Sequence, residues 1–172
     1  MEILYKKLKE VTCVIMDVDG VLTDNTVICA ENGEMLRVMN VLDGYAIKVL
    51  LEHGFYLCVI TGGGSLGVMK RLNHLGIRDI YDKTFHKLDA LKDYFEKYQI
   101  NPEQVVYIGD DIPDMEAMMY CGVRICPADA RPELKSIAQY ICKTRGGEGC
   151  VREVTEMILK LQNKWNIPSF NQ

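Results

Sequence analysis

The sequence predicts an α/β protein built on an open, mostly parallel sheet with helices on both faces. Three short apolar runs, at 11–16, 56–60 and 105–108, are rich in β-branched residues and typical of buried strands. Helical patterns lie between these runs, so neighbouring strands can be joined by helical crossovers. The 172 residues suit one domain spanning 1–172, since no internal repeat, low-complexity tract or linker interrupts them.

The segment 25–40 departs from this alternation and predicts a small β-hairpin insertion. Asn32-Gly33 supplies the two positive φ values of a tight turn between two apolar runs. A free two-stranded ribbon is marginal in water, and this one would leave much apolar surface uncovered. Two arrangements stay open: the hairpin pairs with hairpins of other subunits, or it folds back on its own domain.

The remaining elements follow from apolar periodicity and from residues that begin or end helices. Asp43 is expected to cap a helix that Gly54 ends. The glycine-rich stretch 146–149 predicts flexibility within a C-terminal segment, 144–172. The expected helices are 43–53, 65–75, 87–98, 113–121, 132–138 and 151–164; the additional short strands are 77–81, 123–126 and 140–142; and 167–172 is expected to be a loose tail.

Composition excludes several classes of function. The formal net charge of −4 argues against nucleic acid or an anionic membrane as the main partner. No uncharged apolar run approaches ~18 residues, and the run 11–16 is too short for a signal peptide. The seven cysteines form no C-x-x-C pair, so we expect reduced thiols in a cytoplasmic protein.

Polar residues follow each of the three buried strands, where parallel sheets bind ligands. The segments 17–24 and 109–114 bring carboxylates, and 61–65 brings hydroxyls and glycines. Each segment alone could be a turn with helix caps, but three such segments at matching strand ends indicate a shared site. Clustered carboxylates repel one another, and Mg²⁺ is the usual counter-charge for oxygen ligands. Lys87, at the start of a predicted helix, can add a second cation.

Taken in order, the motifs D-x-D-G-V-x-T-D, T-G, K and G-D-D-x-x-D resemble those of the haloacid dehalogenase (HAD) superfamily of phosphotransferases. All four occur within residues 13–114. The resemblance implies a Rossmann-like fold and Mg²⁺. It also implies that Asp17 is a nucleophile forming an aspartyl-phosphate. Asp19 would be the general acid and then the general base. The Asp17 and Asp110 side chains and the Asp19 carbonyl would hold the metal.

The other motif residues would serve the phosphoryl group and the residues around it. By the same resemblance, Thr61, the Gly62 amide and Lys87 would bind the phosphoryl oxygens. Asp114 would orient Lys87, and Asp111 would support the metal site from outside. The alternative for Asp111 and Asp114 is capping of the helix predicted at 113–121.

The intervals between the motifs leave no room for a large cap domain. In this respect the chain resembles the cap-less, tetrameric branch of the superfamily, on segments 17–24, 40–45, 108–114 and 144–154. That resemblance implies a homotetramer assembled by the hairpins, with a neighbour's tail closing the pocket. It also implies a small-molecule sugar-acid phosphate as substrate, first of all 3-deoxy-D-manno-octulosonate 8-phosphate (KDO-8-phosphate), in lipopolysaccharide precursor synthesis. The alternatives are KDN-9-phosphate and N-acylneuraminate 9-phosphate.

Three further residues, Asp43, His74 and Arg145, are expected substrate contacts from the same resemblance. Arg145 can bind a sugar carboxylate bidentately, or it can be a solvated residue of a mobile loop. His74 matches the octulosonate pattern, or it is a half-exposed helical histidine. Gly63 departs from the Arg or Glu that follows T-G in this branch, so the identity of the sugar stays open.

Two other readings of the function are kept. The chain could be a non-catalytic regulatory or assembly domain, although none of the motif residues is lost. It could also be a protein phosphatase, because an uncovered site admits large substrates. The sequence does not decide the catalytic rate or whether Cys150 is reactive.

Overall fold

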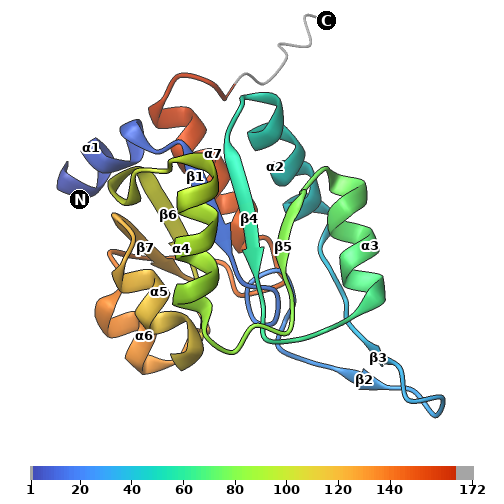
Figure 1. Ribbon diagram of the computed structural model, residues 1–172. Coiled ribbons are helices and arrows are strands. Elements are labelled where there is room, and N and C mark those ends of the chain that lie inside the picture. The colour runs from blue at the N-terminus through green and yellow to red at the C-terminus, as the bar shows by residue number, and fades with distance from the viewer. Residues whose placement is uncertain (1, 166–172) are drawn as a thin grey trace, which may run out of the picture.

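The computed structural model describes residues 2–165 and shows a layered α/β domain (Figure 1). Its centre is a six-stranded sheet in the order β5-β4-β1-β6-β7-β8, and every neighbouring pair is parallel. The strands are β1 (Cys13–Met16), β4 (Tyr56–Ile60), β5 (Asp79–Tyr81), β6 (Val105–Ile108), β7 (Val123–Cys126) and β8 (Tyr140–Ile141). The predicted parallel sheet is therefore confirmed, with the three apolar runs as its adjacent central strands.

Helices cover both faces of this sheet, as predicted (Figure 1). One face packs against α1 (Glu2–Glu10), α2 (Val41–Glu52), α3 (Leu66–Leu75) and α7 (Cys150–Leu161). The other packs against α4 (Lys87–Tyr98), α5 (Met115–Met119) and α6 (Pro132–Ile137). The 3₁₀ turns η1 (Pro102–Gln104) and η2 (Ile112–Asp114) come before and after β6 in the chain.

The strand β1 shows why these runs are apolar throughout. Its side chains alternate between the two cores, with Val14 and Met16 in one and Cys13 and Ile15 in the other. All four are buried. A central strand of a doubly covered sheet has no solvent face, so it carries a continuous apolar run instead of an alternating one.

The predicted hairpin is confirmed as β2 (Ile28–Cys29) and β3 (Met35–Leu36), which pair antiparallel. Gly33 in its turn has φ +83°, which glycine adopts readily, but Asn32 does not have a positive φ, so the predicted pair of positive φ values was wrong. In Figure 1 the hairpin extends away from the body of the domain. Both of its strands are exposed, so within the described chain it does not fold back onto the domain.

Three details differ from the sequence prediction. Helix α1 was not predicted; its Leu4 and Leu8 lie one turn apart and are buried in the core shared with α7. The cap assigned to Asp43 was wrong: α2 begins earlier, and Asn40 caps it by accepting a hydrogen bond from the Leu42 amide. The helix expected over 113–121 is divided into η2 and α5. The loose tail expected at 167–172 falls outside the described residues.

No large cap domain is inserted anywhere in residues 2–165. The hairpin and α2 occupy the chain between the first two motifs, and α3, β5, α4 and η1 occupy the chain between the second motif and β6. Among the described helices, none is both long and apolar enough to cross a bilayer.

Candidate active site

Asp17 is the first residue after β1 and lies at the carboxyl edge of the sheet. Its amide donates to the Ile108 carbonyl at 3.1 Å, so the ends of β1 and β6 are tied together. The Asp17 carboxylate is buried, and its Oδ1 accepts from the Val18 amide at 2.7 Å. The Asp17 carboxylate is thus held in a buried position at the end of β1.

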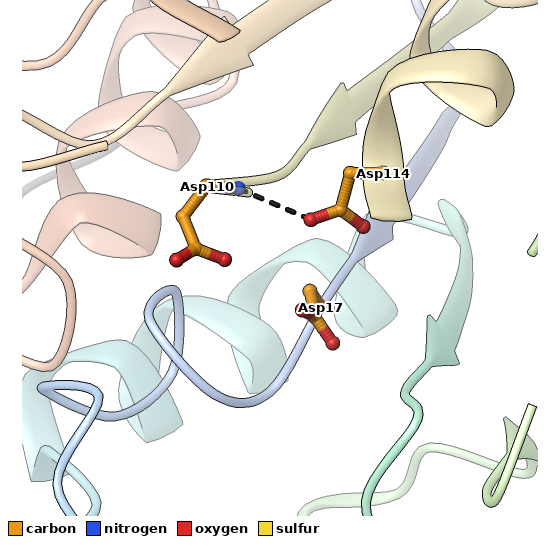
Figure 2. Close-up of side chains that lie close together, drawn as sticks. All are labelled: Asp17, Asp110 and Asp114. Carbon is orange, nitrogen blue, oxygen red and sulfur yellow. Dashed lines mark hydrogen bonds between the residues drawn. The ribbon is translucent and has the colours of Figure 1, made fainter. Parts of the chain in front are cut away.

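Asp110 and Asp114 come from the end of the adjacent strand, β6. Figure 2 shows both side chains beside Asp17, and the Asp110 amide donates to Asp114 Oδ2 at 3.2 Å. Each of the three residues offers a carboxylate oxygen, and these oxygens lie within 4.8 Å of one another. The predicted convergence of the strand ends therefore produces a cluster of three buried carboxylates.

Lys87, the first residue of α4, lies between two of these carboxylates. Its Nζ is 2.8 Å from Asp17 Oδ2 and 2.7 Å from Asp114 Oδ1, and only 4% of its side chain is exposed. Asp114 Oδ1 also accepts from the Tyr107 hydroxyl at 2.8 Å. Asp114 thus uses both oxygens to hold neighbouring groups, as expected of a residue that orients Lys87.

The electrostatics of the cluster favour a further cation. Burial, and then the charge of Asp114, raise the pKa of Asp17 to about 7 against the opposing effect of Lys87. Burial also raises the pKa of Asp110 to about 6, although Asn25 donates to Asp110 Oδ2 at 2.8 Å. Burial lowers the pKa of Lys87, but attraction by Asp114 and Asp17 outweighs it and the net shift is upward. One ammonium therefore leaves these carboxylates incompletely compensated.

The Asp110 carboxylate has a free oxygen that suits a metal ligand. Its Oδ1 is buried and has no hydrogen-bond partner among the residues that the structure describes. Gly20, with φ +86°, allows the chain to pass over it, since a Cβ there would come within 2.1 Å of Asp110 Oδ2. An unpartnered carboxylate oxygen beside Asp17 fits a hard divalent cation with oxygen ligands. The cluster contains the two predicted side-chain ligands, Asp17 and Asp110, together with Asp114, and the assignment of ligands stays a prediction.

The second motif follows β4 at the same edge. Thr61 is buried, and its Oγ1 accepts from the Gly63 amide at 3.2 Å. Thr61 and Gly63 line a small pocket together with Asp19. The structure therefore brings together the four predicted motifs, from the ends of β1, β4 and β6 and the start of α4.

Arg37 is part of this pocket and was missed by the sequence analysis. It follows β3 of the hairpin, and it holds Asp19 through Nε to Oδ1 at 3.0 Å and Nη2 to Oδ2 at 3.2 Å. No local motif marks it. The only signal would have been a basic residue at the base of an insertion that follows a motif rich in carboxylates.

Four further predicted site residues belong neither to the carboxylate cluster nor to the pocket that Asp19 and Thr61 line. Asp43 is buried in α2, where its Oδ1 accepts from the Arg152 amide at 2.8 Å in the first turn of α7. This contact makes Asp43 a cap for α7, which differs from the substrate contact expected. Asp111 is exposed and caps η2 by accepting from the Ile112 amide. His74 is exposed near the end of α3, and Arg145 is exposed and pairs loosely with Asp129 at 3.4 Å.

The glycine-rich stretch 146–149 packs against the loop that carries the first motif. The Gly147 amide donates to the Val21 carbonyl at 3.0 Å, and Asn40 Nδ2 donates to the Gly147 carbonyl at 3.0 Å. A Cβ on Gly146 would lie 1.9 Å from the Gly20 carbonyl oxygen. The stretch is thus held against residues 20–24 in this structure.

Cys150 follows this stretch and is fully buried. Its thiol donates to the Val21 carbonyl at 3.2 Å, and burial raises its pKa. A buried thiol held in its protonated form is a poor nucleophile. The environment of Cys150 therefore indicates a structural residue.

Comparisons with known proteins agree with this geometry. Residues 69–154 match the family model of haloacid dehalogenase-like hydrolases. The chain is 40% identical over 158 residues to 3-deoxy-D-manno-octulosonate 8-phosphate phosphatase of Escherichia coli K12, covering 92% of this chain and 84% of that protein.

Two solved structures have the same fold. The Moraxella catarrhalis 3-deoxy-D-manno-octulosonate 8-phosphate phosphatase, in complex with a magnesium ion, a phosphate ion and KDO, has a TM-score of 0.92 at 37% identity, covering 95% of this chain and 94% of that one. The cobalt-bound Haemophilus influenzae phosphatase has a TM-score of 0.89 at 36% identity, covering 92% of each chain. By fold, motifs and identity, this chain is a member of the haloacid dehalogenase-like hydrolase family.

Proposed function

We propose that the protein is a magnesium-dependent phosphatase that hydrolyses 3-deoxy-D-manno-octulosonate 8-phosphate to the free sugar acid and inorganic phosphate. The observation that carries this proposal is the buried cluster of Asp17, Asp110 and Asp114 around Lys87. Relatives that cover most of this chain are named as phosphatases for this substrate, and one of them holds magnesium, phosphate and KDO.

The reaction needs two displacements at phosphorus. In the first, an Asp17 oxygen bonds to phosphorus, the bond from phosphorus to the sugar oxygen breaks, and Asp19 gives its proton to that oxygen. In the second, water attacks the aspartyl-phosphate, Asp19 takes a proton from the water, and the bond between Asp17 and phosphorus breaks. The products are the free sugar acid and inorganic phosphate, with Asp17 again a carboxylate and Asp19 again protonated.

The neighbouring residues stabilise the charge that develops on the phosphoryl oxygens. The Asp17 and Asp110 side chains and the Asp19 carbonyl would hold Mg²⁺, which would offset negative charge on the phosphoryl group. Lys87, the Thr61 hydroxyl and the Gly62 amide would donate to the phosphoryl oxygens. Asp114 keeps Lys87 in place through the 2.7 Å ion pair.

We assign recognition of the sugar to two exposed residues outside the carboxylate cluster. Arg145 and His74 are exposed, and Arg145, which pairs only loosely with Asp129 at 3.4 Å, is suited to the sugar carboxylate. Asp111, also exposed, would support the metal site from its rim. We leave Asp43 out of the substrate site, because its carboxylate binds the first turn of α7.

The assembled form would be a cytoplasmic homotetramer joined through the hairpin. Ile28, Met35, Leu36 and Val38 expose 55%, 57%, 49% and 63% of their surfaces, and a neighbouring copy would cover them. Light scattering after size-exclusion chromatography tests this expectation, and a monomer at micromolar concentration would contradict it.

Phosphate release from KDO-8-phosphate, KDN-9-phosphate and N-acetylneuraminate 9-phosphate, measured side by side with Mg²⁺, tests the function. We expect the first to have the highest kcat/KM, and Asp17→Asn to abolish its turnover. Asp89→Asn, the same change at an exposed position of α4, should leave turnover intact. A higher kcat/KM on either nine-carbon substrate would reassign the sugar. No turnover of any phosphate monoester would instead favour a non-catalytic domain.

A further inference from the structure

The contact between Arg37 and Asp19 joins the hairpin to the catalytic loop, residues 17–24, which carries the first motif. Arg37 uses two of its nitrogens on the two carboxylate oxygens of Asp19, at 3.0 and 3.2 Å. Its third contact, from Nη1 to the Met35 carbonyl at 3.0 Å, fixes the guanidinium to β3. Only 8% of the Arg37 side chain is exposed, and two of its nitrogens contact the carboxylate, so the pair is bidentate.

The Asp19 carboxylate depends on Arg37 for its orientation. Among the described residues, Arg37 is the one hydrogen-bond donor to that carboxylate. The Asp19 side chain is 32% exposed, so packing alone does not fix it. Removing the Arg37 guanidinium would leave the Asp19 side chain free to rotate.

Gly63 makes room for this pair. A Cβ at residue 63 would lie 3.1 Å from Asp19 Oδ2 and 3.3 Å from Arg37 Nη2. Any longer side chain there would have to share the space with the guanidinium. The absence of a side chain at residue 63, unexplained by the sequence, is thus matched by a guanidinium that enters the same space from the hairpin.

We propose that Arg37 is a positioning residue, which holds the Asp19 carboxylate in place for its role as general base. The proposal rests on the proposed function, in which Asp19 accepts a proton when water attacks the aspartyl-phosphate on Asp17. The bidentate contact fixes the orientation of both Asp19 carboxylate oxygens, and a base must be correctly oriented to accept this proton. With a leaving group that needs little protonation, loss of Arg37 therefore slows hydrolysis of the aspartyl-phosphate more than its formation.

Pre-steady-state kinetics with p-nitrophenyl phosphate and Mg²⁺ test this proposal. The p-nitrophenolate leaving group needs little protonation, so release of the first product does not require Asp19 as an acid. For Arg37→Ala we expect a burst of one p-nitrophenol per active site, followed by a steady-state rate ~10- to 100-fold below that of the wild type. Mass spectrometry of the acid-quenched protein should then find the phosphoryl group on Asp17.

Matched variants separate positioning from a loss of structure. Arg37→Lys, which keeps one cationic donor, should recover part of the rate. Arg78→Ala removes an exposed arginine at the opposite edge of the sheet and should behave as the wild type. In an Asp19→Asn background, Arg37→Ala should lower the rate little further, because the two changes act on one step.

Several results would overturn the proposal. The burst and the steady-state rate of Arg37→Ala could fall together without phosphorylated protein, or its rate could equal or exceed that of the wild type. Additive losses in the double variant would also contradict action through Asp19. Failure of the proposed function looks different: Asp17→Asn would then retain turnover, whatever Arg37 does.

Discussion

Replacing Lys87 by methionine tests the electrostatic balance on which the site depends. Lys87 Nζ lies 2.8 Å from Asp17 and 2.7 Å from Asp114, and the three side chains are 4%, 10% and 1% exposed. Methionine keeps the unbranched shape but removes the charge. Two buried carboxylates then lose their shared ammonium. Removing one partner of a buried ion pair costs about 3–5 kcal/mol, and we expect a loss of that size in the free energy of unfolding at pH 8 without magnesium.

The loss should depend on pH in a defined direction. The pKa of Asp17 is raised from 3.8 to about 7, so its contribution to stability is present below pH 3.8 and is lost as pH rises through about 7. Because Lys87 lowers that pKa, its removal moves the pKa further up and penalises the ionised form more. The difference between Lys87→Met and the wild type should therefore be larger at pH 8 than at pH 5.

Urea unfolding followed by circular dichroism at the two pH values measures this difference. Lys97→Met is the matched control, because Lys97 lies on the same helix and its 2.7 Å pair with Asp79 leaves the lysine 54% exposed. Asp79 is 12% exposed but also accepts from the Tyr98 hydroxyl at 2.9 Å, so losing the half-exposed lysine should cost little. Equal losses for both variants, or a loss at Lys87 that does not change with pH, would refute the reasoning.

Three further predictions concern magnesium, the glycine-rich stretch and α7. In thermal unfolding, Mg²⁺ should stabilise the wild type more at pH 8 than at pH 5, because burial raises the pKa of Asp110 to about 6 and this ligand is partly protonated at the lower pH. Asp110→Asn should remove most of this stabilisation, and EDTA should stop phosphate release. Gly146→Ala should lower the free energy of unfolding by ~1–3 kcal/mol, since its Cβ would meet the Gly20 carbonyl at 1.9 Å, whereas Gly67→Ala in α3, where a Cβ has space, should not lower it. Burial raises the pKa of Asp43 from 3.8 to about 6, so the contribution of this group to stability is present below pH 3.8 and is lost as pH rises through about 6. In urea unfolding, the stability of Asp43→Asn relative to the wild type should therefore be higher at pH 8 than at pH 5.

The parts of the fold that the sequence predicts well are those with a local physical signal. The central strands were recognisable because a doubly covered strand must be apolar at every position, as β1 is. The convergence of the motifs followed from parallel pairing alone, since parallel strands place their carboxyl ends at one edge. The cluster of Asp17, Asp110 and Asp114 could therefore be anticipated from the order of the motifs along the chain.

The parts that were missed depend on contacts between distant residues. Arg37 is 18 residues from Asp19, and nothing between them specifies that the base of the hairpin returns to the catalytic loop. Asp43 looks like a helix cap, and it is one, but for α7, more than a hundred residues away, because Asn40 already caps α2. A capping preference is a local property, whereas the identity of the capped helix is a tertiary one.

The glycine-rich stretch 146–149 is another case in which a local sequence pattern does not predict the tertiary contacts. A run of glycines predicts flexibility because each glycine has access to more backbone conformations than other residues. The structure indicates two other reasons. Gly149 adopts φ +108° where α7 begins, and Gly146 is small enough to lie against the Gly20 carbonyl. A sequence cannot distinguish a glycine selected for freedom from one selected for small size. If Gly146 is needed for its size, substitution by alanine will displace the loop that carries Asp17 and Asp19 and reduce turnover along with stability.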